Sequence, residues 1–292
     1  MDDNPFGAAL LPRDRSFDLL SARLAAKEWG APGGRRIIAL HGWLDNAASF
    51  DRLAPLLTGC HLCAVDAAGH GFSDPRPPGA AYNIWQEVGD VIDIADALGW
   101  ERFSLLGHSR GAAVSVLAAG AFPGRVEKLI LLDGGVPVMG RAEEAPANLA
   151  RSIEQVRERS GKTGRVFETE TAAIEERANG FSKVSFDAAA LLARRSLRRV
   201  DGGYRWHQDQ RLKAAPELRL TAAHVRAFIT AVTAPVLTIL AEQSFFSERP
   251  EYLQMLDLFA KGKLIRLPGG HHFHMEGARE AIARDVLEFL RR

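Results

Sequence analysis

The sequence predicts an α/β fold with a mostly parallel sheet, helices on both faces of the sheet, and a helical cap insertion. Short apolar runs rich in β-forming residues alternate with longer stretches of helical periodicity, which is typical of parallel strands joined by crossover helices. Each apolar run ends in glycine or polar residues, where a loop is expected to begin. The alternation stops at about residue 137 and resumes at about residue 221, which indicates an insertion.

Six segments are expected to be strands and two stand out as helices. The strands are predicted at 35–42, 60–71, 102–109, 126–135, 234–242 and 262–270. The helices are predicted at 85–100 and 278–292. In a sheet of this kind the functional residues gather in loops at the carboxyl ends of the strands. The loops after the predicted strands are therefore the places to look for chemistry.

The insertion divides the chain into three stretches. Residues 1–136 are expected to form the first part of the core, 137–221 a helical cap, and 222–292 the second part of the core. The cap stretch is rich in Arg, Glu and Ala and shows no clear buried strand. Its basic cluster 193–200, "ARRSLRRV", has acidic neighbours and no interleaved aromatic residues. It is therefore predicted to be a solvated helical face rather than a nucleic-acid site.

The composition is close to that of an average globular protein. The chain has 292 residues, of which 47% are hydrophobic and 25% charged, and its formal net charge is +1. This charge offers no attraction to nucleic acid or to an anionic membrane. No apolar run approaches the length of a membrane span, and the acidic N-terminus lacks the pattern of a secretory signal. A cytoplasmic location is therefore expected.

The two cysteines form a C-x-x-C pattern that invites a metal or redox interpretation. Cys60 and Cys63 lie in an expected buried strand, where cysteine behaves as a small hydrophobic residue. A structural zinc site would need a second pair of ligands, and the sequence has no further cysteine. No metal site and no cofactor are therefore predicted.

The stretch "FSLLGHSRGAAVS", residues 103–115, places a serine on a tight corner between a strand and a helix. Its G-x-S-x-G pattern is that of a nucleophile elbow, in which the serine projects from a strained turn. Gly107 and Gly111 leave room for that turn, and the start of the helix offers free N–H groups near developing negative charge. Ser109 is the predicted nucleophile.

A serine hydroxyl needs a base to remove its proton, and "LPGGHHFHMEG" offers histidines late in the chain. With its Gly270, His271, His274 and Glu276, this segment resembles the G-H-x-x-H-x-E ending of many α/β-hydrolases. The resemblance implies the α/β-hydrolase fold and places the catalytic base at His271, with His274 as a supporting neighbour. His272 stays open as a second candidate for the base.

Two backbone N–H groups are expected to form an oxyanion hole. One is that of Arg110, the residue after the nucleophile. The other is implied by the loop after "IIALHGW", which resembles the His-Gly-x segment of the family and assigns the role to Trp43. The side chain of His41 in this loop is expected to be structural, as are Asp66 and His70 in "VDAAGHGFSD".

The sequence leaves more than one candidate for the acid that orients the histidine. Most relatives carry it after the strand found here as "PVLTILAEQS", where Ser244 stands in place of aspartate and Glu242 is nearby. Some α/β-hydrolases carry it after the preceding strand, which here delivers Asp133. Adjacent parallel strands would bring Asp133 to the same sheet edge as Ser109. Asp133 is the predicted acid, and Glu242 and Glu248 remain alternatives.

A closer resemblance is carried by "LHGWLDNAASFDRLAPLL", "AVDAAGHGFSD", "LLGHSRG" and "LLDGG". These motifs are similar to those of the serine hydrolase-like proteins, a branch of the cap-bearing α/β-hydrolases. The resemblance implies a cofactor-independent serine hydrolase and no substrate. Dehalogenases and epoxide hydrolases of this fold use an aspartate nucleophile, so Ser109 argues against both.

The expected activity is that of a carboxylesterase or thioesterase that acts on a small to medium apolar acyl substrate through an acyl-enzyme. Two alternatives stay open: a carbon–carbon bond hydrolase of the same fold, and a non-catalytic ligand-binding module on a hydrolase scaffold. The expected partner is a small-molecule substrate, with no nucleic acid and no membrane, and the sequence predicts no particular oligomeric state.

Overall fold

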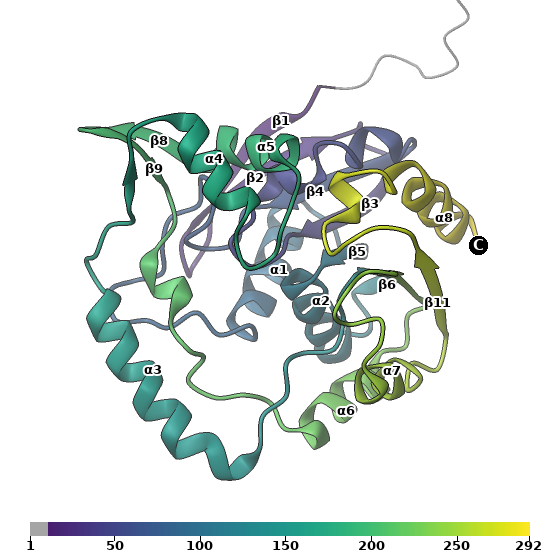
Figure 1. The fold of residues 1–292 in the computed structure, drawn as a ribbon. Coiled ribbons are helices and arrows are strands. Elements are labelled where there is room, and N and C mark those ends of the chain that lie inside the picture. Colours follow the sequence, from purple (N-terminus) through teal and green to yellow (C-terminus); the bar gives the residue numbers. More distant parts are fainter. Residues whose placement is uncertain (1–10) are drawn as a thin grey trace, which may run out of the picture.

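The fold is built on one large sheet, described here in a computed structural model for residues 11–292 (Figure 1). Its eight strands lie in the order β1-β2-β4-β3-β5-β6-β10-β11. The six strands from β4 to β11 in this order run parallel, and β1 and β2 extend one edge antiparallel. The strand bounds are β1 Arg13–Asp18, β2 Arg23–Trp29, β3 Arg35–Leu40, β4 Cys60–Val65, β5 Phe103–His108, β6 Val126–Leu132, β10 Val236–Ala241 and β11 Gly262–Leu267.

Helices cover both faces of this sheet because successive strand residues point to opposite sides. In β3, Ile38 and Leu40 join one buried cluster, while Ile37 and Ala39 join the other. The first cluster includes apolar residues of α1, α2, α6 and α7, and the second includes those of α8. The helix bounds are α1 Gln86–Ala97, α2 Arg110–Ala121, α6 Ala222–Ala231, α7 Pro250–Leu256 and α8 Arg279–Arg291.

All six strands and both helices expected from the sequence form, which confirms the predicted fold class. The hairpin of β1 and β2 was not among the predicted strands. All residues of β1 except Phe17 are exposed, so the strand lacks the apolar run that identifies its buried neighbours. No helix among residues 11–292 has the length and apolarity needed to cross a membrane.

The stretch 137–221 interrupts the sheet between β6 and β10, and is called the cap segment below. It holds three helices, and Figure 1 shows α3 set apart from α4 and α5. It also contains a small antiparallel sheet in the order β7-β9-β8, which was not among the predicted elements. These strands are two to four residues long, too short to give an apolar alternation. The bounds are α3 Ala145–Arg159, β7 Val166–Phe167, α4 Glu170–Ala178, α5 Phe186–Ser196, β8 Leu197–Val200 and β9 Gly203–Trp206.

The basic cluster 193–200 is not the solvated helical face that the sequence predicted. It covers the end of α5 and the whole of β8, and Arg195 within it is buried. The Arg195 Nε donates to the buried carboxylate of Asp66 at 2.8 Å, and its Nη1 lies 2.5 Å from Asp14 of β1. The guanidinium also lies over the ring of Phe72. Arg195 therefore attaches the cap segment to the core.

Helix α2 packs closely on the sheet because Gly111 has no side chain. A Cβ at Gly111 would lie 2.1 Å from the Leu40 carbonyl oxygen of β3, and one at Gly107 would lie 2.5 Å from the Cα of Ala112. Glycine at these two positions lets the first turn of α2 sit against the ends of β3 and β5. This contact fixes the direction in which the corner residue between β5 and α2 points.

We expect Gly111→Ala to lower the free energy of unfolding by about 1–3 kcal/mol, because the added methyl group meets backbone that cannot move freely. A matched control is Gly89→Ala in α1, where a Cβ would meet nothing within 4 Å. That change should raise the free energy of unfolding by about 0.5–1 kcal/mol, the intrinsic helix preference of alanine over glycine. Urea denaturation of both variants tests the prediction, and equal effects would contradict it.

Candidate active site

Ser109 occupies the corner between β5 and α2 in a strained conformation. Its φ of 51° and ψ of −114° lie outside the regions that side-chain-bearing residues favour. The neighbouring structure holds it there: the Ser109 N–H donates to the Leu132 carbonyl of β6 at 3.0 Å, and its own carbonyl accepts from Ala113 of α2 at 3.2 Å. The hydroxyl is thereby presented at the carboxyl end of the sheet, as the sequence predicted for an elbow.

The structure brings Ser109, His271 and Asp133 together, although they come from three separate parts of the chain. The Nε2 of His271 lies 2.9 Å from the Ser109 Oγ, and the Nδ1 of the same ring lies 2.5 Å from the Asp133 Oδ2. With its Nδ1 proton donated to the carboxylate, the imidazole presents a lone pair at Nε2 to the serine hydroxyl. This arrangement can take a proton from Ser109 and stabilise the resulting imidazolium.

The Asp133 carboxylate is fully buried and receives three hydrogen bonds. Besides His271, the backbone N–H of Ala241 donates to Oδ1 at 3.0 Å, and the Ser244 hydroxyl donates to Oδ2 at 2.6 Å. Asp133 itself has a positive φ of 40°, which turns it at the end of β6 toward β10. Ser244 stands at the position where most relatives carry the acid, and here its hydroxyl donates a hydrogen bond to the acid. The sequence showed only that an aspartate is missing from this position, and this hydrogen bond was not predicted.

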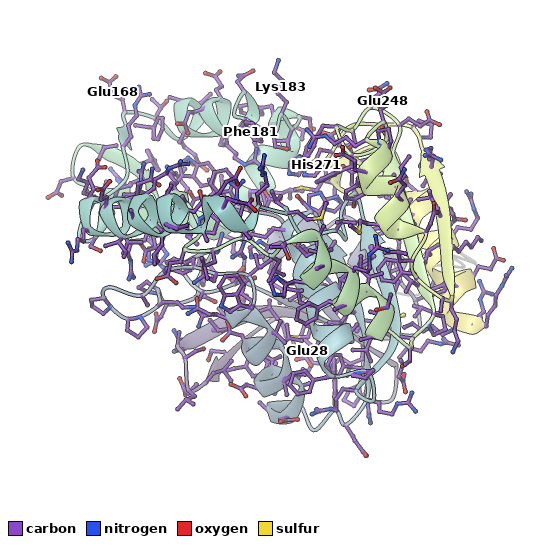
Figure 2. The ribbon with its side chains drawn as sticks, turned by 90° about the horizontal axis from the view of Figure 1, so that it is seen from below. Glu28, Glu168, Phe181, Lys183, Glu248 and His271 are labelled. Atoms are coloured by element: carbon purple, nitrogen blue, oxygen red, sulfur yellow. The ribbon has the colours of Figure 1, made fainter. Side chains whose placement is uncertain are left out.

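The alternative acids lie away from the histidine. Glu242 and Glu248 are both exposed, and neither side chain bonds to His271 in the part of the chain that the structure describes. Figure 2 shows Glu248 directed outward at the molecular surface and His271 further inward. The geometry therefore favours Asp133.

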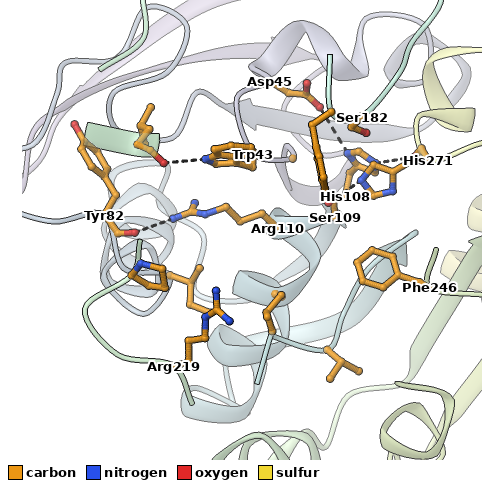
Figure 3. Close-up of a pocket in the computed structure, with 18 of the residues that line it drawn as sticks. Trp43, Asp45, Tyr82, His108, Ser109, Arg110, Ser182, Arg219, Phe246 and His271 are labelled. Carbon is orange, nitrogen blue, oxygen red and sulfur yellow. Dashed lines mark hydrogen bonds and ion pairs between the residues drawn. The ribbon is translucent and has the colours of Figure 1, made fainter. Parts of the chain in front are cut away.

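The two amides predicted for an oxyanion hole are available. Arg110 is the first residue of α2, so its N–H has no partner within the helix. Among residues 11–292, neither this amide nor that of Trp43 donates a hydrogen bond. Their side chains point elsewhere. The Trp43 indole donates to the Leu212 carbonyl at 3.0 Å, and Arg110 donates to the Tyr82 carbonyl at 3.5 Å (Figure 3). Arg110 also forms an ion pair with Glu87. Trp43 and Arg110 line the same cavity as Ser109, and both amides are free in the sequence positions expected for oxyanion donors.

The other histidines have different partners. His272 lies 3.1 Å from the Oδ2 of Asp45, and Arg177 of α4 donates to the Oδ1 of the same carboxylate at 2.6 Å. Burial would raise the pKa of Asp45, but His272 and Arg177 hold it well below its usual range.

His274 bonds to the Ser49 hydroxyl at 2.8 Å, as expected of a supporting neighbour. Neither ring contacts Ser109, so the geometry favours His271 over His272 as the base.

His41 and Asp66 act on the backbone of nearby loops, as expected of structural residues. The Nε2 of His41 accepts from the Ala67 N–H at 3.0 Å. The Asp66 carboxylate accepts from the N–H groups of Ala47 at 2.7 Å and Phe72 at 2.9 Å. These bonds tie the loop after β3 to the loop after β4, and the first of these loops carries Trp43.

Two groups of side chains include residue types that can bind metal ions. The side chains of Asp45, His108 and His272 are buried, with ligand atoms within 4.8 Å of one another. The Arg177 guanidinium bonds to both Asp45 and His272, so a cation already neutralises this group. In β4, burial raises the pKa of Cys60 to about 11 and that of Cys63 to about 12, which keeps both thiols protonated at neutral pH.

A cavity of about 660 Å³ opens in front of Ser109 (Figure 3). Most of its wall is apolar, and core and cap segment both contribute. The apolar lining residues are Trp43, Tyr82, Ile84, Trp85, Ala113, Val136, Val138, Phe181, Leu212, Ala214, Pro216, Leu218, Leu220, Phe245 and Phe246. Three of these residues are phenylalanines: Phe181 from the cap segment, and Phe245 and Phe246 from the loop after β10.

Comparisons with known proteins identify the family and the fold. The sequence profile of the alpha/beta hydrolase fold family matches residues 35–278. Serine hydrolase-like protein 2 of Homo sapiens is 34% identical over 290 residues, covering 91% of this chain and 90% of that protein. The serine hydrolase-like protein of Danio rerio is 30% identical over 287 residues, covering 91% of this chain and 85% of that protein. The crystal structure of a hypothetical protein from Pseudomonas aeruginosa PAO1 is 44% identical, with a TM-score of 0.92, covering 96% of this chain and 99% of that one.

The buried histidines make the stability of the fold depend on pH. Burial, together with the nearby His272, lowers the pKa of His274 to about 3. Between that value and the unfolded pKa of about 6.5, the unfolded chain binds a proton at this site and the folded chain does not. The stability that the neutral His274 ring contributes to the fold is therefore fully present above the unfolded pKa. This stability is lost as the pH falls through the window, and the loss is about 2 kcal/mol at about pH 5.

We expect the free energy of unfolding to fall from pH 7 to pH 5, and less steeply in His274→Gln, which has no titrating ring. The two pH slopes, measured by urea denaturation, should differ by about 1.4 kcal/mol per pH unit in the middle of the window. Identical slopes would show that His274 takes up its proton without unfolding.

Proposed function

Because the chain belongs to the alpha/beta hydrolase fold family, we propose that it is a serine hydrolase that cleaves carboxylic esters or thioesters through a covalent acyl-enzyme. The observation that carries the proposal is the hydrogen-bonded chain from the Ser109 hydroxyl through His271 to the buried Asp133. A hydroxyl held 2.9 Å from a properly oriented imidazole is the arrangement that activates serine as a nucleophile.

In the first half of the reaction, the Ser109 Oγ attacks the carbonyl carbon of the substrate while the His271 Nε2 takes the hydroxyl proton. The carbonyl oxygen becomes negatively charged and is stabilised by the N–H groups of Trp43 and Arg110. When the carbon–oxygen or carbon–sulfur bond breaks, His271 returns the proton to the leaving alcohol or thiol. The acyl group then remains on Ser109.

In the second half, water replaces the leaving group. His271 takes a proton from the water molecule as its oxygen attacks the acyl carbon, and then gives that proton to the Ser109 Oγ as the acyl–enzyme bond breaks. Asp133 keeps the Nδ1 proton of His271 in place throughout and stabilises the imidazolium. The products are a carboxylic acid and free enzyme, and the cycle needs no cofactor.

The cavity supports the choice of substrate class. Its lining is mostly apolar and aromatic, which favours a small to medium apolar acyl group packed beside Ser109. We further propose that residues 137–221 act as a cap over the core formed by 1–136 and 222–292. Phe181 and Leu212 of this segment line the same cavity as Ser109 and Phe245 of the core.

We expect a fluorophosphonate probe to modify Ser109, since such probes react with activated serine hydroxyls. Mass spectrometry of the labelled peptide locates the adduct, and His271→Ala should abolish labelling. Pre-steady-state hydrolysis of a p-nitrophenyl ester should show a burst of p-nitrophenol from acyl-enzyme formation. A well-folded protein that is not labelled would instead favour a ligand-binding module on a hydrolase scaffold.

Asp133→Asn should lower kcat by about 10³–10⁴, because an amide cannot hold the required histidine tautomer or stabilise its charge. Glu242→Gln is the matched control, and it should leave kcat unchanged because that side chain is exposed and does not bond to His271. Circular dichroism and urea denaturation should confirm that both variants fold. Near-wild-type turnover in Asp133→Asn would move the acid to Glu242 or Glu248.

A further inference from the structure

The charged residues around the cavity leave an excess of positive charge. Asp45 is the only carboxylate among the lining residues that the structure describes, and Arg177 and His272 pair with it. On the cationic side, Arg110 is neutralised by Glu87. The two other lining arginines remain without an ion pair.

Arg219 and Arg249 are these two residues, and both are exposed. Within residues 11–292, no carboxylate lies within 4.0 Å of either guanidinium. The Arg249 guanidinium lies 5.7 Å from the ring centre of Phe245, which in turn packs near the His271 ring. Arg219 makes no such contact with an aromatic ring. Figure 3 shows Arg219 and Tyr82 toward one end of the cavity and Ser109 and His271 toward the other.

We propose that the substrate is an amphipathic acyl compound with an anionic group, a carboxylate or a phosphate, and that Arg219 binds this group at the end of the cavity remote from Ser109. This inference rests on the proposed ester or thioester hydrolysis and adds the substrate class. The planar guanidinium suits either anion, because it can donate two parallel hydrogen bonds to adjacent oxygens.

Because the cavity is mostly apolar, the unpaired charge of Arg219 can distinguish anionic from neutral substrates. While the cavity is open, water solvates Arg219, as its exposure allows. A neutral acyl compound that fills the cavity displaces part of this water and offers no replacement for its hydrogen bonds. An anionic compound displaces the same water and supplies a charged partner in surroundings of lower dielectric constant. Arg219 therefore favours anionic substrates over neutral ones of the same length.

Two pairs of substrates separate the possible positions of the anion. The first pair is p-nitrophenyl hexanoate and mono-p-nitrophenyl adipate, which differ by a carboxylate at the end of the acyl chain. The second is S-hexanoyl-N-acetylcysteamine and hexanoyl-coenzyme A, which differ by the phosphates of the leaving group. In at least one pair, kcat/KM of the wild-type enzyme should be about tenfold or more higher for the anionic member, as expected of a charged hydrogen bond.

Arg219→Gln should remove this preference and leave kcat/KM for the neutral member within about twofold, whereas Arg219→Lys should retain part of it. Arg226→Gln is the matched control, because it removes an exposed arginine of the following helix that does not line the cavity. It should leave the preference intact. No preference in either pair, or an equal loss for both members in Arg219→Gln, would overturn the proposal.

Binding to Ser109→Ala separates this inference from the proposed function. Isothermal titration of the same four compounds measures recognition without turnover, with and without the Arg219→Gln change. Tighter binding of an anionic member that depends on Arg219 would support the inference even if the enzyme hydrolysed none of the compounds. Equal binding of neutral and anionic members would refute it even if Ser109-dependent hydrolysis were demonstrated.

Discussion

Asp133 lies fully buried at the end of β6, between the strand that leads to Ser109 and the strand that precedes Ser244. Its carboxylate accepts hydrogen bonds from His271, from the Ala241 backbone and from the Ser244 hydroxyl. A buried carboxylate needs such donors to remain charged, and here they come from β10 and from the loops after β10 and β11. The orientation of His271, and so the distance from its ring to Ser109, depends on this one buried group.

The backbone around the site is strained where the chemistry requires it. Ser109 and Asp133, at the ends of adjacent strands, both have positive φ, as does Leu44 in the loop that carries Trp43. Such conformations persist only when the surrounding packing enforces them. Here the packing comes from the parallel sheet and from the glycine contacts that let α2 approach β3 and β5.

Buried ion pairs connect the cap segment to the core in two places. Arg195 of α5 reaches Asp66 in the loop after β4, and Arg177 of α4 reaches Asp45 in the loop after β3. Each arginine neutralises a carboxylate that is fully buried in the core. Breaking such a pair leaves a buried charge without a partner, so these contacts hold α4 and α5 in one position against the core. The second pair also neutralises Asp45, the one carboxylate among the described residues that line the cavity.

Strand periodicity and the G-x-S-x-G spacing are local features of the chain, so the parallel sheet and the corner at Ser109 could be predicted from them. The choice of His271 came from the resemblance of its segment to the ending of many α/β-hydrolases. Features that depend on contacts between distant segments required the three-dimensional structure. Whether Asp133 or Glu242 faces His271 depends on how β6 and β10 lie side by side, and the role of Ser244 appears only when its hydroxyl meets that carboxylate. Strand β1 and the cap strands left no apolar pattern, because β1 is exposed and the cap strands are two to four residues long. The excess charge of the cavity likewise emerges only in three dimensions, where each arginine either finds a carboxylate or does not.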